Sequence, residues 1–201
     1  MLSPAQHRGF TLIELLVTIA LIAILLLLSV PALGTWSADA RVRSTAESLQ
    51  NALRLAQATA VARSRSSVFA LTNANPAWNA TPVTNGSRWF IDVLPLTGSD
   101  ETASADSFVQ GGTVASQYGV TITGPALLCF NSLGQQTTKS ASATGLSATC
   151  TASAEDSSAP IEYTLSKTGA VRALKVRVYL GGRVRMCDAA KTLSDTNPDG
   201  C

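Results

Sequence analysis

GFTLIELLVTIALIAILLLLSVPALGTWSA, residues 9–38, is the most informative stretch of this 201-residue sequence. From residue 15 to residue 38 it carries no formal charge, and Leu, Ile, Val and Ala dominate it. A helix needs about 20 apolar residues to cross the hydrocarbon core of a bilayer, so residues 15–33 predict a transmembrane helix. A buried core helix is the alternative, which the length of the run and its consecutive leucines disfavour.

A basic pair precedes the apolar run. His7 and Arg8 stand directly before Gly9. A secretory signal peptide is cut after its apolar stretch, whereas a cut at Gly9 would leave the apolar helix on the mature protein. Because a positive leader stays in the cytoplasm, we expect a single-pass protein with its C-terminal domain in the periplasm.

The segment Gly9-Phe10-Thr11-Leu12-Ile13-Glu14 resembles the processing site of type IV prepilins and type II secretion pseudopilins. The resemblance implies that a prepilin peptidase cuts after Gly9 and methylates Phe10. It also implies that Glu14 meets the amino terminus of a neighbouring subunit during assembly. A lone carboxylate in an apolar helix is costly in lipid and needs such a partner. A glutamate that snorkels to the headgroups is the alternative.

The helix is predicted to continue beyond the apolar run. Pro31 lacks a backbone donor, so we expect a kink or a loosened turn there. Farther along, apolar residues recur at spacings of three and four and define one helix face. They are Ala46, Leu49, Ala52, Leu53, Ala56, Ala60 and Val61. We therefore predict one long helix from about residue 10 to about residue 65.

Short β-prone runs separated by turn residues follow the helix. The predicted strands cover residues 67–71, 88–94, 119–123, 126–131, 161–166, 172–180 and 183–187. We expect them to form an antiparallel sheet against the helix, with residues 97–117 and 135–160 as long loops. The predicted class is α+β, in a type IV pilin-like fold. Its parts are a leader (1–9), a transmembrane or filament-core helix (10–36), an amphipathic continuation (37–66) and a periplasmic β-sheet domain (67–201).

The four cysteines are Cys129, Cys150, Cys187 and Cys201, without a CxxC pair or a nearby histidine. This pattern disfavours a metal site. In an oxidising compartment two disulfides are expected, and three connectivities are possible. We favour Cys129 with Cys150 and Cys187 with Cys201, because each bridge would close a loop-like segment, while the other pairings stay open.

Enzymatic activity has little support in the sequence. His7 is the only histidine and lies in the predicted leader, so no Ser-His or Cys-His nucleophile can be assembled. Glycine-rich phosphate loops are absent. We therefore predict neither a catalytic site, nor a metal, nor a cofactor.

The net charge of +2 favours neither nucleic acid nor an acidic substrate, but the charge is unevenly distributed. Residues 161–191 contain seven Lys and Arg against two acids, whereas residues 92–156 contain six acids and one lysine. A three-residue turn with Gly182 in the left-handed conformation would pair Tyr179 with Arg183. That register gathers basic residues on one strand face and the valines on the other. The face comprises Lys175, Arg177, Tyr179, Arg183 and Arg185.

Gly182-Arg183-Val184-Arg185 resembles the Gly-Arg-x-Arg signature of FimT-type minor pilins, in which it is associated with DNA binding during uptake. Overall the chain resembles the GspH/FimT group of pilin-like proteins, which also includes FimU. A solvated edge strand that resists aggregation is the alternative explanation of the basic residues.

The predicted function is a minor type IV pilin that assists filament assembly and binds double-stranded DNA without strong sequence preference. The alternative is the minor pseudopilin H of type II secretion, and a membrane-tethered enzyme is a third, disfavoured class. The expected partners are other pilins or pseudopilins, the prepilin peptidase and the bacterial inner membrane, with final assembly into a pilus or pseudopilus.

Overall fold

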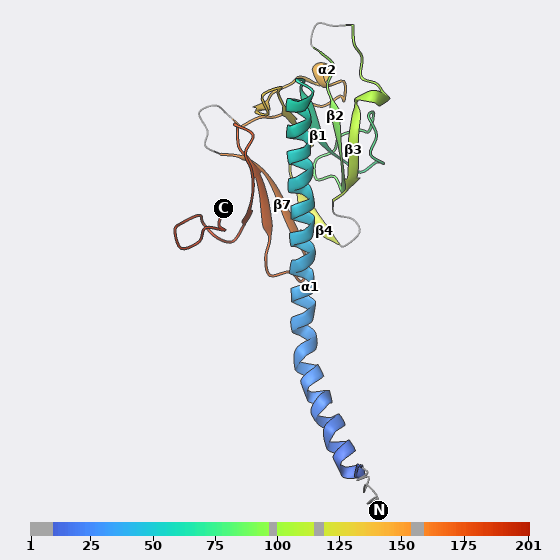
Figure 1. The fold of residues 1–201 in the computed structure, drawn as a ribbon, viewed down its shortest axis with the longest axis vertical. Coiled ribbons are helices and arrows are strands. Elements are labelled where there is room, and N and C mark those ends of the chain that lie inside the picture. The colour runs from blue at the N-terminus through green and yellow to red at the C-terminus, as the bar shows by residue number, and fades with distance from the viewer. Residues whose placement is uncertain (1–9, 97–99, 115–118, 154–158) are drawn as a thin grey trace, which may run out of the picture.

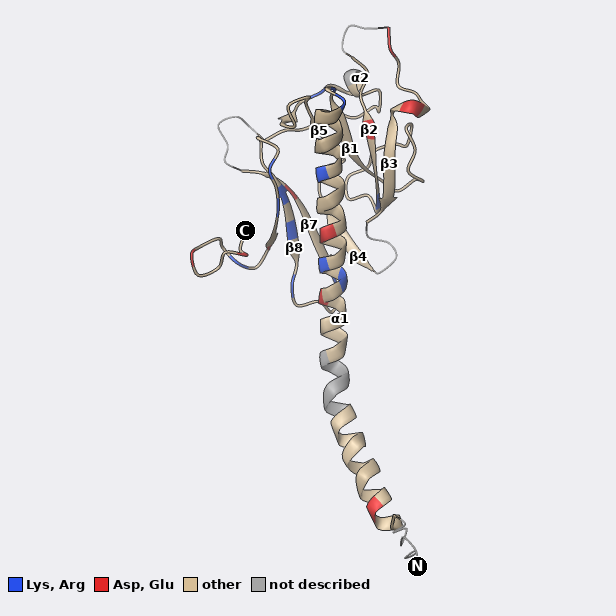
Figure 2. Ribbon diagram, in the orientation of Figure 1, with Lys and Arg blue, Asp and Glu red and all other residues tan. Residues whose placement is uncertain are grey.

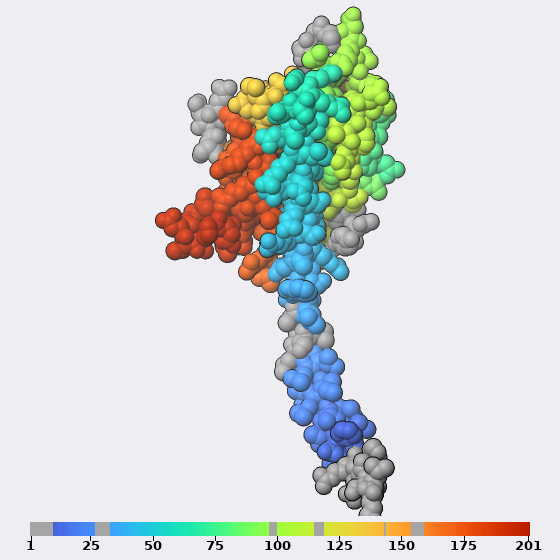
Figure 3. All heavy atoms as spheres, viewed as in Figure 1, coloured from blue at the N-terminus to red at the C-terminus, as the bar shows by residue number. Residues whose placement is uncertain are grey.

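The computed structural model describes residues 10–96, 100–114, 119–153 and 159–201, without the side chains of residues 27–32 and 143. Helix α1 (Leu12–Ala62) runs the length of the molecule, and its upper half packs on the β-strands (Figure 1). The lower half stands clear of the domain as a stalk (Figure 3). The predicted leader, residues 1–9, lies outside the described residues.

The strands form two antiparallel sheets where the sequence predicted one. The first has the order β3-β2-β1-β5-β6 and the second the order β4-β7-β8-β9. The first sheet contains β1 (Ser67–Thr72), β2 (Arg88–Val93), β3 (Phe108–Thr113), β5 (Leu127–Phe130) and β6 (Gln136–Thr137). The second contains β4 (Val120–Thr123), β7 (Ile161–Lys167), β8 (Leu174–Val178) and β9 (Val184–Asp188).

One stripe of α1 joins the two sheets into a single core. The stripe consists of small and branched residues that are fully or almost fully buried: Val42, Ala46, Leu49, Ala52, Leu53, Ala56 and Ala60. The stripe belongs to the same core as Phe69 of the first sheet and Tyr163 of the second, whose ring centroids lie 5.9 Å apart in an edge-to-face arrangement. Burying a leucine or phenylalanine side chain contributes about 1.5–3 kcal/mol, so this stripe fixes the helix on the domain.

A smaller core covers the other side of the first sheet. Phe90 and Leu127 lie in it, close to the disulfide between Cys129 and Cys150. Asp92 lies on the same face of β2 and is only 3% exposed. Burial raises the pKa of Asp92 to about 7, and its Oδ1 has no hydrogen-bond partner among the described residues.

Two predicted loops contain regular structure, so that part of the prediction was wrong. The stretch 97–117 includes β3 and a 3₁₀ turn, Ala105–Ser107, and the stretch 135–160 includes β6 and the short helix α2 (Ala141–Thr144). Strand β3 was missed because Gly111 and Gly112 interrupt its apolar pattern. A Cβ at Gly111 would lie 2.2 Å from Pro76 Cβ, so the close approach of another loop requires this glycine.

The predicted long helix is present, with bounds three residues or fewer inside the predicted ones. It is continuous through Pro31, so the proline does not end it, and the predicted kink falls where side chains are not described. Within the described ranges, no helix combines the length and the apolar character needed to cross a membrane. The assignment of residues 10–36 to a transmembrane or filament-core helix stays a prediction.

Candidate functional site

The first turn of α1 is closed by a capping box. Thr11 Oγ1 accepts a hydrogen bond from the Glu14 backbone N–H at 3.3 Å, and Glu14 Oε2 accepts one from the Thr11 N–H at 3.2 Å. This arrangement satisfies two of the free donors at a helix start. The Thr-x-x-Glu spacing was visible in the sequence, but Glu14 was interpreted as a partner for another subunit or as a snorkelling side chain, and not as part of a helix cap. The proposed processing residue Gly9 lies outside the described residues.

The stalk presents apolar side chains on all sides. From Phe10 to Leu26 every described side chain is exposed, and Glu14 is the one charged residue among them (Figure 2). The large exposed side chains include Leu12, Ile13, Leu16, Ile19, Ile22, Leu25, Leu33 and Trp36. A contiguous apolar surface of this extent marks a contact with a membrane or another protein.

The β8–β9 hairpin has the predicted register. The Tyr179 N–H donates to Arg183 O at 3.0 Å, and Gly182 has a φ of +86°. The turn also rests on the rest of the domain, since a Cβ on Gly182 would lie 1.9 Å from Gly134 O and 2.3 Å from Gln57 Nε2. Both the left-handed conformation and the lack of space require glycine at this position.

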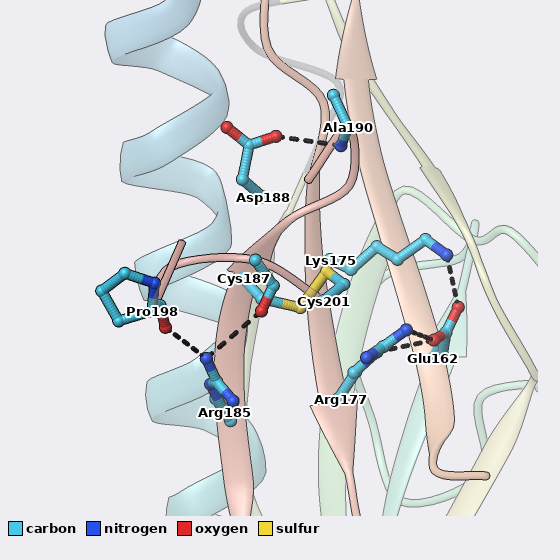
Figure 4. The surroundings of a disulfide bond; sticks show 10 residues. Glu162, Lys175, Arg177, Arg185, Cys187, Asp188, Ala190, Pro198 and Cys201 are labelled. Carbon is cyan, nitrogen blue, oxygen red and sulfur yellow. Dashed lines mark hydrogen bonds and ion pairs between the residues drawn. A yellow bond between two sulfur atoms is a disulfide. The ribbon is translucent and has the colours of Figure 1, made fainter. Parts of the chain in front are cut away.

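Two of the four cations on the predicted basic face pair with a single carboxylate, and the sequence analysis missed this pairing. Glu162 of β7 accepts from Lys175 Nζ at 2.7 Å and from Arg177 at 2.6 Å, as Figure 4 shows. Burial alone would raise the pKa of Glu162, but the hydrogen bonds from the two cations lower it overall. The residue could have been found only from the β7–β8 register, which places Glu162 opposite Arg177.

The two arginines of the Gly-Arg-x-Arg segment have different surroundings. Arg185 is directed to the C-terminal loop, where its guanidinium donates to Pro198 O at 2.5 Å and Gly200 O at 3.2 Å (Figure 4). Arg183 is exposed and lies over the Tyr179 ring, 4.2 Å from its centroid. It makes no ion pair with any residue in the described part of the chain. The predicted face therefore contains one cation without a carboxylate or carbonyl partner, Arg183.

The C-terminal segment folds back on β9. The disulfide between Cys187 and Cys201 fixes its end, and the Asp188 N–H donates to Asp199 O at 2.8 Å. The other disulfide links Cys129 with Cys150. Both bridges have the connectivity that the sequence favoured. Within the described residues, no group of three or more His, Cys, Asp or Glu side chains could hold a metal ion.

Two kinds of solved structure are similar to this chain. One is the type IV minor pilin FimU of Pseudomonas aeruginosa, with 14% identity, a TM-score of 0.43, and coverage of 74% of this chain and 94% of that one. The other is the minor pseudopilin EpsH from the type 2 secretion system of Vibrio cholerae, with 12% identity, a TM-score of 0.44, and coverage of 75% and 99%. No curated protein sequence matches the chain.

The N-terminal segment matches a family model directly. The model describes the prokaryotic N-terminal methylation motif and matches residues 4–30. The match spans the predicted cleavage position, the capping box and most of the exposed apolar stalk. This chain carries a prokaryotic N-terminal methylation motif that leads into an α+β domain.

Proposed function

We propose that the protein is a type IV pilin-like structural subunit and not an enzyme. One observation carries the proposal: the methylation motif occupies the start of a helix whose described side chains from Phe10 to Leu26 are all exposed. A soluble monomer would leave that apolar surface in water, at a cost that only association removes. Packing of the stalk against the helices of other subunits therefore accounts for both the methylation motif and the exposed apolar surface.

Processing prepares the stalk for assembly. The peptidase cuts after Gly9, so Phe10 becomes the methylated amino terminus, one residue before the Thr11 N-cap. Glu14 Oε2 is already bonded to Thr11, and the new amino group lies on the same turn. A neighbouring subunit's amino terminus then competes with Thr11 for the carboxylate. Glu14 thus sets the register of subunit addition.

The two disulfides support a location of the domain outside the cytoplasm, in the periplasm, since such bonds persist in oxidising compartments. Residence of the stalk in the inner membrane before assembly stays a prediction. Carbonate extraction of the processed subunit checks it, because a peripheral protein is released and an inserted one is not.

The test of the assembly proposal is mass spectrometry of the mature chain from cells that contain the prepilin peptidase. We expect a chain that begins with methylated Phe10. The variant Glu14→Val should be processed normally but incorporated poorly into filaments, whereas Glu47→Val, on the domain half, should be incorporated like the wild type. An unprocessed chain that begins with Met1 would contradict the proposal.

Weak, sequence-independent DNA binding is a second candidate function. It rests on Arg183, whose guanidinium lies on Tyr179 at the tip of a hairpin anchored by Gly182. An arginine fork can bridge phosphate oxygens, and an aromatic ring beside it can stack on an exposed base. Lys175 and Arg177 contribute less, because Glu162 neutralises part of their charge.

Titration of residues 37–201 with duplex DNA at two salt concentrations tests this function. Each lost phosphate contact lowers the log-log salt slope by about 0.9. We expect Arg183→Gln to remove one such contact and Arg185→Gln to have a smaller effect. Glu162→Gln should strengthen binding, because it releases two cations. Thermal melts serve as the folding control. If the wild type shows no salt-dependent binding, the minor pseudopilin of type II secretion becomes the better assignment.

A further inference from the structure

A groove of about 570 Å³ lies between α1 and the free edge of the second sheet. Trp36, Ala40 and Arg43 form its helical wall, while Leu174 and Met186 contribute apolar surface from β8 and β9. Trp36 is 71% exposed. Asp199 of the C-terminal loop also lines the groove. A volume of this size is in the range of about 300–1,000 Å³ that is typical of ligand sites.

The hydrogen bonds of β9 show which backbone groups face away from β8. Tyr179 bonds to Arg183, and the Ala189 N–H donates to Ala173 O, so the odd-numbered residues of β9 pair with β8. The even-numbered residues therefore direct their N–H and C=O to the outer edge. Three of these groups are already bonded. Val184 O accepts from the Gln50 and Arg54 side chains of α1. The Asp188 N–H donates to Asp199 O, and Asp188 O accepts from the Lys191 N–H.

Met186 lies between these two capped positions. No described residue supplies a partner for its backbone N–H or C=O. Its side chain lines the groove, so the outward-facing backbone pair and the apolar wall occur at the same place. An extended strand that adds to a sheet edge pairs with the free backbone N–H and C=O of a residue on that edge.

We propose that this groove binds a short extended segment of an adjacent subunit, which pairs with Met186 and places a bulky apolar side chain against Trp36. The identity of the occupant rests on the proposed assembly function. Trp36 lines the groove and continues the exposed apolar stalk, so a subunit packed on the stalk already lies next to the groove. Capping of Val184 and Asp188 limits the pairing to about one residue on each side of Met186.

Selection of a random 12-residue peptide display library on the full chain in mild detergent tests the groove. We expect the selected peptides to share a bulky apolar residue within a β-prone stretch. Trp36→Ala should weaken their binding at least about tenfold, as expected for a central tryptophan contact. In nuclear magnetic resonance spectra of the labelled chain, a bound peptide should shift the Met186 amide and slow its hydrogen exchange.

A matched pair of variants isolates the backbone contact. Met186→Pro removes an N–H that β8 does not use, whereas Met186→Leu keeps the N–H and the side-chain volume. Proline should abolish binding and leucine should preserve it. A peptide that is N-methylated at the pairing residue gives the same test without altering the protein. Binding that is insensitive to Trp36→Ala and to peptide methylation, or a selection that yields no peptide, would overturn the groove assignment.

The source of the segment is tested in assembled filaments. A photoreactive benzoylphenylalanine at position 36 should cross-link to an extended segment of another subunit, while the same group at position 193, on the C-terminal loop, serves as the control. Cross-linking at position 36 to lipid alone overturns the assignment to an adjacent subunit. Mass spectrometry of the mature chain tests the assembly proposal separately. A failure of the groove proposal can therefore be distinguished from a failure of the assembly proposal.

Discussion

The two halves of α1 differ in where their apolar side chains lie. Between Phe10 and Leu26 the apolar side chains surround the helix, and all those described are exposed. Between Ala38 and Ala60 the buried apolar residues form one stripe, and polar residues such as Arg43 and Glu47 cover the other side. Val61, which the sequence placed on this stripe, is 50% exposed. The upper half thus finds its partner in its own chain. The lower half needs a partner from elsewhere.

The two halves differ in the periodicity of their apolar residues as well as in the number of these residues. A 3.6-residue period with one apolar stripe specifies a surface helix on a domain, whereas an apolar surface on every side specifies a helix surrounded by other molecules. Substitutions matched between the two halves should therefore affect different properties. Those in the upper half should change folding, and those in the lower half should change association.

The largest expected effect comes from a matched pair of leucines. Leu53 is 0% exposed and Leu16 is 53% exposed. Leu53→Ala should lower the free energy of unfolding of the domain by about 2–5 kcal/mol, because it leaves a cavity in the core. Leu16→Ala should leave the denaturation midpoint unchanged and reduce filament incorporation. A comparable loss of stability from both substitutions would show that the stalk packs within its own chain.

The difference between the apolar lower half and the amphipathic upper half of α1 could be predicted from the sequence, because each pattern extends over several turns. The position of Gly182 and the Tyr179–Arg183 pairing were also predictable, since turn chemistry and burial select one register. The pairing of Glu162 with Lys175 and Arg177 was not, because it depends on which strand lies beside β8. The burial of Asp92 was missed for a similar reason, since the predicted strand 88–94 does not reveal that a second core covers the face of β2 on which Asp92 lies.

Two carboxylates, one buried in the domain and one exposed on the stalk, should differ in their effect on the pH dependence of stability. The pKa of Asp92 is raised to about 7 by burial. Between its ordinary value of 3.8 and about 7, the folded chain holds a proton that the unfolded chain has released. Stability should therefore fall as the pH rises through that window, by at most about 1.4 kcal/mol per pH unit. Asp92→Asn should abolish this dependence in denaturant titrations at pH 4.5 and pH 7.5.

Glu14 supplies the control for this measurement. It is exposed on the stalk, and its hydrogen bonds are confined to the first turn. Glu14→Gln should leave the pH profile of domain stability as it is in the wild type. A flat profile for the wild type would mean that Asp92 is ionised in the folded protein.

Two alanines test how tightly each half is packed. Ala46 is 0% exposed between α1 and the sheets, whereas Ala23 is exposed on the stalk. Ala46→Leu should destabilise the domain by about 1–3 kcal/mol through overpacking. Ala23→Leu should have no effect on the thermal melt. Equal melts for the two variants would indicate that α1 shifts on the sheets to make room.

The smallest effect is expected at Gly34, which lies between the two halves. A Cβ built there meets no atom within 4 Å, so alanine fits without strain. Because glycine costs a helix interior about 1 kcal/mol relative to alanine, Gly34→Ala should strengthen this part of α1. Amide hydrogen exchange of the adjoining turn should slow about fivefold, which corresponds to 1 kcal/mol. The domain should melt at the wild-type temperature, since the stalk contributes nothing to its core. A raised melting temperature would show instead that the two halves of α1 unfold together. The upper half, which packs on the domain, and the lower half, which associates with other molecules, would then differ in their surfaces but not in their stability.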